Sequence, residues 1–282
     1  MKKVIFLALA SFVCLLNSCM NEPEILTTSA DILNMNTVNS DQSLSISSSS
    51  TWNAKSSDSW CSLSDSVGKG NKDIKVLCKN NYDGLDRKTK ITINFGKQTK
   101  TIVVNQSGGQ VLFDENFDNN DNNWIAPFDS VSEKINNGMF NINNTGKYYE
   151  YFIGTKSLIK DYTGNYMIIM KYNHVSGIAP FGLTFANKDK NNFYLFLLQP
   201  QGWYFLGNME NGLFTRIFNY PSASVVVYNT ICLVKTGNTC DIYVNDKKLN
   251  TFYLTAPHGS YVGFYSCPQS EVNVDYLKVI QI

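Results

Sequence analysis

Histidine is almost missing from this chain of 282 residues, which contains only His174 and His258. Imidazole is the commonest ligand of transition metals and the usual general base of serine and cysteine hydrolases, so this scarcity argues against both kinds of site. The Gly-x-Ser-x-Gly turn that exposes a nucleophilic serine is absent as well. We therefore expect neither a transition-metal enzyme nor a serine hydrolase.

An excess of charge of either sign is also lacking. The chain has 24 Lys and Arg against 23 Asp and Glu, for a net charge of +1. Removal of residues 1–18, which contain two lysines and no acidic residue, changes this to −1. Because nucleic-acid binding depends on a surplus of basic side chains, we expect no nucleic-acid partner.

The one long apolar run, Val4 to Leu16, follows two lysines and is too short to span a bilayer. It ends in Leu16-Asn17-Ser18-Cys19, which resembles a bacterial lipobox. The resemblance implies a lipoprotein signal peptide over residues 1–18, a lipid-modified Cys19 and a tether over residues 19–25, which would make the protein an outer-membrane lipoprotein of the cell envelope. Whether it faces the periplasm or the cell surface stays open, and an ordinary signal peptide with an unmodified cysteine is the alternative.

Five cysteines lie beyond Cys19, an odd number that cannot pair completely within the chain. Their spacings match no zinc motif, and an exported protein is free to hold disulfides. We interpret them mainly as small buried residues, with Cys61 and Cys78 as a candidate bridge. The five are Cys61, Cys78, Cys232, Cys240 and Cys267.

Helical periodicity is nearly absent, and short runs such as "TKITINF", "CDIYVND" and "NVDYLKVI" alternate between apolar and polar residues instead. The chain is therefore predicted to be all-β. Its length suits two domains, and the paired glycines of "NQSGGQ" mark a boundary between residues 26–109 and 111–282. Gly237-Asn238, between two alternating runs, predicts a tight hairpin.

The first segment has two tryptophans, Trp52 and Trp60, a Gly-x-Gly turn, Arg87 before a strand, and a last strand that ends near Gln106. In these features it resembles a BACON domain, the Bacteroidetes-associated carbohydrate-binding, often N-terminal module. The resemblance implies an immunoglobulin-like β-sandwich over residues 26–109. We expect both tryptophans to fill its core, and a role as a spacer is as compatible with the sequence as carbohydrate binding.

The second segment resembles the laminin-G or concanavalin A-like jelly roll in the order of its strand motifs. The matching positions include Gly182-Leu183-x-Phe185, Tyr194-x-Phe196, Tyr243-Val244-Asn245 and Asp275. Asp246 departs from the glycine that the family often has after Tyr-Val-Asn. The resemblance implies a second β-sandwich over residues 111–282.

The stretch "NNFYLFLLQPQGWYFLGN", residues 191–208, predicts a hairpin with its turn at Gln199-Pro200-Gln201-Gly202. A turn that places Leu198 opposite Trp203 would gather Tyr194, Phe196 and Phe205 on one face, and the mainly aliphatic other face would point inward. Gln199, Gln201, Asn208 and Asn219 supply amides nearby, and Tyr148, Tyr149, Tyr151 and Tyr220 supply further rings. Aromatic rings beside amides suit the C–H patches and hydroxyls of sugars.

Acidic residues raise two further possibilities. The stretch "FDENFDNNDNNW" carries Asp114, Glu115, Asp118 and Asp121, whose oxygens could hold calcium, although a solvated loop explains them too. Glu271 and Asp275 lie four residues apart on one strand face, the arrangement that a glycosidase would need, but no Glu-x-Asp-x-x-Glu run is present.

We therefore predict a non-catalytic, lipid-anchored protein that binds polysaccharide or glycoconjugate without a cofactor other than possible calcium, with neighbouring envelope proteins as further candidate partners. The predicted sugar-binding residues are Trp203, Tyr194, Tyr220 and Tyr148. Two alternatives stay open: a structural or protein-interaction lipoprotein, and an unrecognised carbohydrate-active enzyme of concanavalin-like fold.

Overall fold

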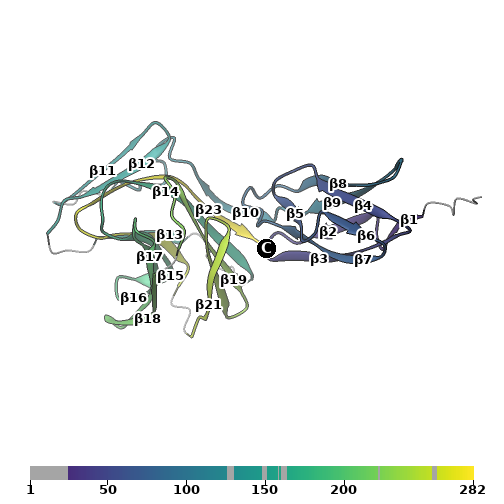
Figure 1. The fold of residues 1–282 in the computed structure, drawn as a ribbon. Coiled ribbons are helices and arrows are strands. Elements are labelled where there is room, and N and C mark those ends of the chain that lie inside the picture. The colour runs from purple at the N-terminus through teal and green to yellow at the C-terminus, as the bar shows by residue number, and fades with distance from the viewer. Residues whose placement is uncertain are drawn as a thin grey trace, which may run out of the picture.

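The computed structural model describes residues 25–125, 130–147, 151–157, 159, 164–221, 223–255 and 259–282. All regular structure in these residues is β-strand, so the all-β prediction of two successive sandwiches is confirmed (Figure 1). None of the described residues form a helix that could cross a bilayer.

The first sandwich packs a four-stranded sheet, in the order β1-β3-β7-β5, against a five-stranded sheet, in the order β2-β9-β8-β4-β6. Its strands are β1 (Leu26–Thr28), β2 (Ile32–Met35), β3 (Ser40–Ser48), β4 (Thr51–Ser56), β5 (Cys61–Leu63), β6 (Val67–Lys69), β7 (Lys72–Cys78), β8 (Arg87–Phe95) and β9 (Gln98–Gln106).

Alternation along these strands builds the first core, as on β8, where Ile91, Ile93 and Phe95 point inward. Trp52 is the largest buried side chain, and its indole N–H donates to the carbonyl of Gly70. Its ring lies so close to Gly68 that a β-carbon there would approach within 2.2 Å, so only glycine fits. Trp60 also packs against this core, under the guanidinium of Arg87, whose Cζ lies 4.4 Å from the ring centroid.

The second sandwich packs an eight-stranded sheet, β11-β12-β23-β14-β19-β20-β21 with β10 also paired to β23, against a six-stranded sheet, β13-β22-β15-β16-β17-β18. Its strands are β10 (Gln110–Glu115), β11 (Val131–Asn136), β12 (Met139–Asn144), β13 (Tyr151–Ser157), β14 (Tyr166–Gly177), β15 (Phe181–Asp189), β16 (Asn192–Leu198), β17 (Trp203–Glu210), β18 (Leu213–Pro221), β19 (Asn229–Thr236), β20 (Thr239–Val244), β21 (Lys247–Tyr253), β22 (Tyr261–Ser266) and β23 (Ser270–Gln281). The predicted hairpin at Gly237-Asn238 joins β19 to β20.

The first sandwich docks on the outer face of the eight-stranded sheet. Val38 and Tyr82 pack there against an apolar cluster that includes Ile169, Val234 and Ile280. Polar contacts surround this cluster, and they include an ion pair of 3.1 Å between Lys79 Nζ and an Asp246 carboxylate oxygen.

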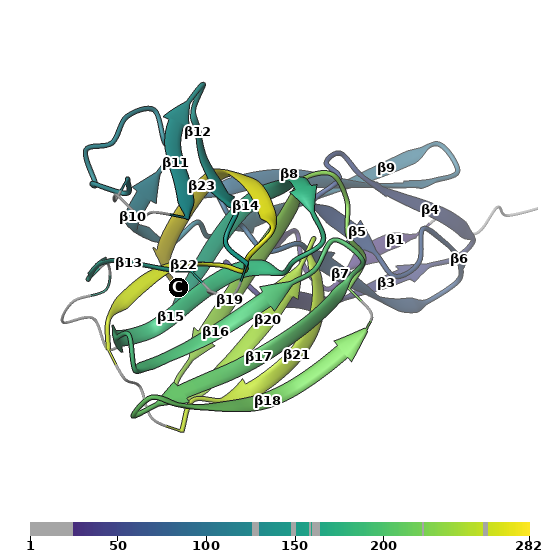
Figure 2. The same cartoon turned by 90° about the vertical axis from the view of Figure 1, so that its left-hand side faces the viewer.

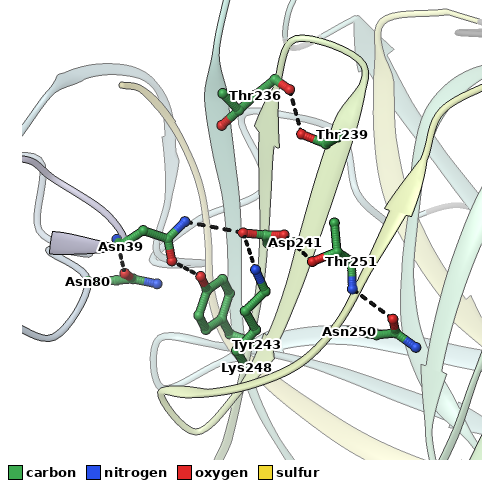
Figure 3. A network of polar contacts seen from close by, with 9 residues as sticks. All are labelled: Asn39, Asn80, Thr236, Thr239, Asp241, Tyr243, Lys248, Asn250 and Thr251. Atoms are coloured by element: carbon green, nitrogen blue, oxygen red, sulfur yellow. Dashed lines mark hydrogen bonds and ion pairs between the residues drawn. The ribbon is translucent and has the colours of Figure 1, made fainter. Parts of the chain in front are cut away.

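Asn39 is the centre of the polar part of this junction (Figure 3). Its carbonyl oxygen accepts a hydrogen bond from the hydroxyl of Tyr243, and its amide nitrogen donates to Asp241 at 3.2 Å. The same Asp241 carboxylate accepts from Thr251 and pairs with Lys248. Contacts of both kinds therefore hold the two sandwiches together.

Docking on the eight-stranded sheet leaves the six-stranded sheet on the far side of the molecule. Figure 2, viewed from the side opposite the first sandwich, shows β15 to β18 in front. Residue 25, where the described chain begins, belongs to the first sandwich, which lies at the other end in Figure 1. β1, the first described strand, therefore lies at the end of the molecule away from the six-stranded sheet.

Candidate functional site

The turn between β16 and β17 sets the geometry of the candidate site. Gly202 N donates to Gln199 O, Gln199 N donates to Trp203 O, and Gly202 has a φ of 90°. This is a type I turn followed by a left-handed glycine, the three-residue hairpin loop with a bulge. Leu198 therefore pairs with Tyr204 and not with Trp203, so the predicted register is wrong by one residue.

The shift reverses the faces of β16 relative to β17, because neighbouring residues of a strand point to opposite sides. Phe205 of β17 still points outward as predicted. Tyr194, Phe196 and Leu198 point into the sandwich core together with Tyr204 and Leu206. Phe193, Leu195 and Leu197 point outward and pack with Phe205. Tyr194 is completely buried, with its hydroxyl 3.2 Å from Thr255 Oγ1, so its prediction as a ligand contact is wrong.

The outward residues of β17 and the neighbouring β18 form a surface that we call the outer aromatic surface. Strand pairing places Phe214 opposite Met209, Arg216 opposite Gly207 and Asn219 opposite Phe205. A bulge in β18 between these pairs keeps Arg216 and Asn219 on the same side. The surface consists of Trp203, Phe205, Phe214, Arg216 and Asn219.

Side-chain contacts confirm this placement. The Arg216 guanidinium carbon lies 5.4 Å from the centroid of the Phe205 ring, a cation–π arrangement. The Phe214 ring lies directly over Gly207, where a β-carbon would come within 2.4 Å of it. Gly207 therefore allows the Phe214 ring to lie flat on the strand.

Trp203 is the exposed end of this surface, with 48% of its area accessible. It is the first residue of β17, and the backbone hydrogen bonds of the turn hold it in place. Beside this surface, on the same face of β16, Phe193, Leu195 and Leu197 are each at most 3% accessible. The surface is therefore a rigid, partly apolar platform with one indole presented to solvent.

This arrangement has the chemistry of a sugar platform. An aromatic ring face receives the C–H groups of a pyranose, while amide and guanidinium donors bind hydroxyl or acidic oxygens. Among the described residues Arg216 makes no ion pair, so its charge is available to a ligand. Phe214 and Arg216 were not predicted from the sequence, although the two-residue turn Asn211-Gly212, in which both residues have a positive φ, sets their pairing with β17.

The other predicted residues do not join this platform. Tyr220 is 49% accessible but pairs with Tyr204, so it lies on the opposite face of the sheet, where its ring contacts Phe218. Asn208 pairs with the inward Tyr194 and is buried. Tyr148 and Cys19 lie outside the described residues.

The acidic loop after β10 is organised by hydrogen bonds within the protein. Glu115 is buried, and its carboxylate accepts from Phe117 N at 2.7 Å, Asn122 Nδ2 at 2.5 Å and the Trp124 indole N–H at 2.7 Å. Asp118 accepts from Asn116. In the part of the chain that the structure describes, no three His, Cys, Asp or Glu side chains gather as metal ligands.

Glu271 and Asp275 lie on the outer face of the eight-stranded sheet, and each carboxylate binds a polar side chain of a neighbouring strand. Asn141 Nδ2 donates to Glu271 at 3.0 Å, and Lys171 Nζ pairs with Asp275 at 2.6 Å. A glycosidase needs one carboxyl group as an acid and a second as a nucleophile or base toward a bound sugar. Both carboxylates instead serve as partners of residues on adjacent strands.

Comparison with protein families identifies one module. The BACON family, described as "Putative binding domain, N-terminal", matches residues 50–107. The predicted resemblance is therefore confirmed for this part of the first sandwich. No curated protein sequence matches the chain.

Solved structures similar to the chain include three sugar-related proteins. A GH5 xyloglucanase of Bacteroides ovatus in complex with a XXXG heptasaccharide has 24% identity and a TM-score of 0.29, and the alignment covers 30% of this chain and 18% of that one. The carbohydrate-binding module CBM66 of Bacillus subtilis has 15% identity, a TM-score of 0.41 and coverages of 50% and 86%. The galectin LEC-6 of Caenorhabditis elegans has 15% identity, a TM-score of 0.37 and coverages of 46% and 94%. The low identities and TM-scores of these three structures assign no function to this chain. The chain also spans less than a fifth of the length of the xyloglucanase.

Proposed function

We propose that this protein binds polysaccharide or glycoconjugate on the outer aromatic surface, without catalysing a reaction on it. The observation that carries the proposal is the half-exposed Trp203 indole on a rigid sheet face, in line with Phe214, Arg216 and Asn219. An exposed ring on a sheet costs free energy in water, and a sugar face would cover it. The neighbouring cation and amide would orient the sugar through its oxygens.

The first sandwich acts in this proposal as a spacer. Its tryptophans pack with the core, Trp52 wholly and Trp60 under Arg87, so they form no exposed row of rings. The chain enters at the end of the molecule away from the six-stranded sheet (Figure 1). A lipid on Cys19 would therefore hold the outer aromatic surface away from the membrane of a cell envelope.

Affinity electrophoresis of the whole chain through gels that contain host or plant polysaccharides tests this function. We expect at least one polysaccharide to retard the protein, and Trp203→Ala to reduce the retardation at least fivefold. The matched control is Tyr253→Ala, which removes a ring that is 71% accessible on β21 of the other sheet. Retardation by no polysaccharide, or equal retardation of all three proteins, would overturn the proposal and favour a protein-interaction role.

A further inference from the structure

Two cysteines of the first sandwich face each other across neighbouring strands. Cys61, the first residue of β5, is paired with Cys78, the last residue of β7. Lys79 N donates to Trp60 O at 2.9 Å, and Ser64 N donates to Lys75 O at 2.9 Å. These bonds make Trp60–Lys79 and Ser64–Lys75 hydrogen-bonded pairs. Because such pairs alternate with non-hydrogen-bonded pairs along an antiparallel ladder, Cys61 and Cys78 form a non-hydrogen-bonded pair. Cys61 N donates to Asp58 O, within its own strand connection.

This type of pair suits a disulfide. Opposed α-carbons in a non-hydrogen-bonded pair are about 4.5 Å apart, and native disulfides accept separations from about 4.4 Å. The thiols face each other closely enough for hydrogen bonding with Cys78 to lower the pKa of Cys61 to about 7, while the same interaction and burial raise the pKa of Cys78. A bond between the sulfurs therefore needs little movement of either strand.

The other described cysteines have no such arrangement with one another. Cys232 and Cys240 lie in adjacent strands, but Cys232 belongs to the cluster on the outer face of the eight-stranded sheet and Cys240 to the core between the sheets. Cys267 packs on the outer face of the six-stranded sheet. The five cysteines beyond Cys19 therefore comprise one facing pair, Cys61 and Cys78, and three cysteines that lie in separate places.

We infer that Cys61 and Cys78 form a reversible intramolecular disulfide when the protein meets a low-molecular-weight disulfide such as glutathione disulfide. The thiolate of the partly accessible Cys78 attacks one glutathione sulfur, forms a mixed disulfide and releases one glutathione. The Cys61 thiolate then attacks the Cys78 sulfur and releases the second glutathione. The protein loses two electrons and two protons, and glutathione disulfide gains them as two thiols.

Cys61 is only 3% accessible and Cys78 is partly accessible, so Cys78 is the cysteine that a reagent in solvent meets first. A hollow of about 360 Å³, lined by Cys61, Lys55 and Asp58, opens on one side. A second hollow of about 410 Å³, lined by Cys78 with Lys79 and Tyr243, opens toward the domain junction. Burial and the Asp58 carboxylate oppose the thiolate of Cys61, whereas hydrogen bonding from Ser56 and, more weakly, the Arg87 guanidinium favour it.

The disulfide would link the short edge strand β5 covalently to β7. β5 has only three residues and is the edge strand of its sheet. Its attachment to β7 closes the loop that contains β6, and the residue after Cys78 is Lys79, which pairs with Asp246 of the second sandwich. Oxidation is therefore expected to stabilise both the first sandwich and its side of the junction.

Peptide mapping tests the inference on the whole chain. The protein is incubated with glutathione disulfide, alkylated under denaturing conditions and digested with trypsin. We expect a disulfide-linked pair of peptides, Ser56–Lys69 with Val76–Lys79, which separates on reduction. Recovery of both peptides in alkylated form, of a persistent glutathione adduct, or of a link from either peptide to another cysteine would overturn the inference.

Thermal unfolding gives an independent readout. A disulfide that closes a loop of this length raises the Tm by roughly 10 °C or more in a small domain. We expect the oxidised chain to show this rise in the transition of the first sandwich and the Cys78→Ala variant to show none under either redox condition. An equal Tm for the oxidised and reduced protein would contradict the predicted fastening of β5.

Discussion

Trp203 and Tyr220 lie on adjacent strands of one sheet and point to opposite faces of it, although each is about half accessible. Trp203 points outward beside Phe205, and Tyr220 points to the side of Tyr204 and Phe218. Two exposed rings that are near in the fold therefore serve different surfaces. Only Trp203 belongs to the outer aromatic surface.

Trp203→Ala should weaken polysaccharide binding about tenfold, because stacking of one ring contributes on the order of 1 kcal/mol or more. Tyr220→Ala should leave the affinity within twofold of the unsubstituted protein. Isothermal titration with a polysaccharide that retards the chain measures both, with circular dichroism to verify folding. Equal losses in the two variants would place the ligand on the open edge of the sandwich instead.

Arg216→Gln should discriminate between sugars. Its guanidinium is available for a carboxylate or sulfate group, so we expect a loss of about three- to tenfold for acidic polysaccharides and no change beyond twofold for neutral ones. The salt dependence of acidic-sugar binding should also decrease. Lys190→Gln, an exposed charge in the turn before β16, is the control. An equal loss for both classes of sugar would mean that Arg216 acts only by packing on Phe205.

Glu115→Ala should destabilise the second sandwich by about 2–4 kcal/mol, because it removes the acceptor of three donors, two of them buried. Asp121→Ala, in the same loop but exposed, should change the stability by less than about 0.5 kcal/mol. Chemical denaturation measures both free energies of unfolding. Because protein donors occupy the Glu115 carboxylate, a chelator should not change the Tm of the unsubstituted protein. A fall in Tm with chelator, restored by calcium, would instead assign the loop to a cation.

Acid should loosen the junction between the sandwiches. Burial alone would raise the pKa of Asp241, but hydrogen bonds from Lys248, Thr251 and Asn39 outweigh it and lower that pKa below its usual value. A lowered pKa in the folded state adds stability that is complete above the unfolded value, about 3.9, and is lost as the pH falls through the folded value.

Asp241→Asn should therefore lower the Tm by about 3 °C at pH 7 and by progressively less below pH 4. Differential scanning calorimetry across this range measures the difference from the unsubstituted protein. Asp65→Asn, which removes the partner of Lys72 at an exposed site of the first sandwich, is the control that should not affect the junction. A difference that stays constant with pH would show that Asp241 is not charged in the folded protein.

Much of the strand pattern could be predicted from the sequence, because alternation and turn chemistry are local. The Gly237-Asn238 hairpin formed as expected, and the tryptophans of the first sandwich pack with its core. The inward face of β16 could not be predicted, because the turn with the left-handed Gly202 shifts the pairing by one residue, which reverses the faces of β16 relative to β17.

Contacts between distant parts of the chain were beyond prediction for a different reason. Asn39 and Tyr243 are 204 positions apart, and nothing in either local sequence indicates that they meet. Asn219 likewise lies opposite Phe205 only because β18 carries a bulge between Arg216 and Phe218. Such placements depend on tertiary pairing, which local patterns do not encode.

The most direct measurement is the intrinsic fluorescence of the whole chain during titration with a retarding polysaccharide. Of the four tryptophans, Trp52 and Trp124 are buried, Trp60 lies beneath Arg87, and Trp203 alone is substantially accessible. We predict a saturable shift or quenching of emission that disappears in Trp203→Phe. Binding that leaves the emission unchanged, or a change that persists in Trp203→Phe, would contradict the assignment of the sugar site to the outer aromatic surface.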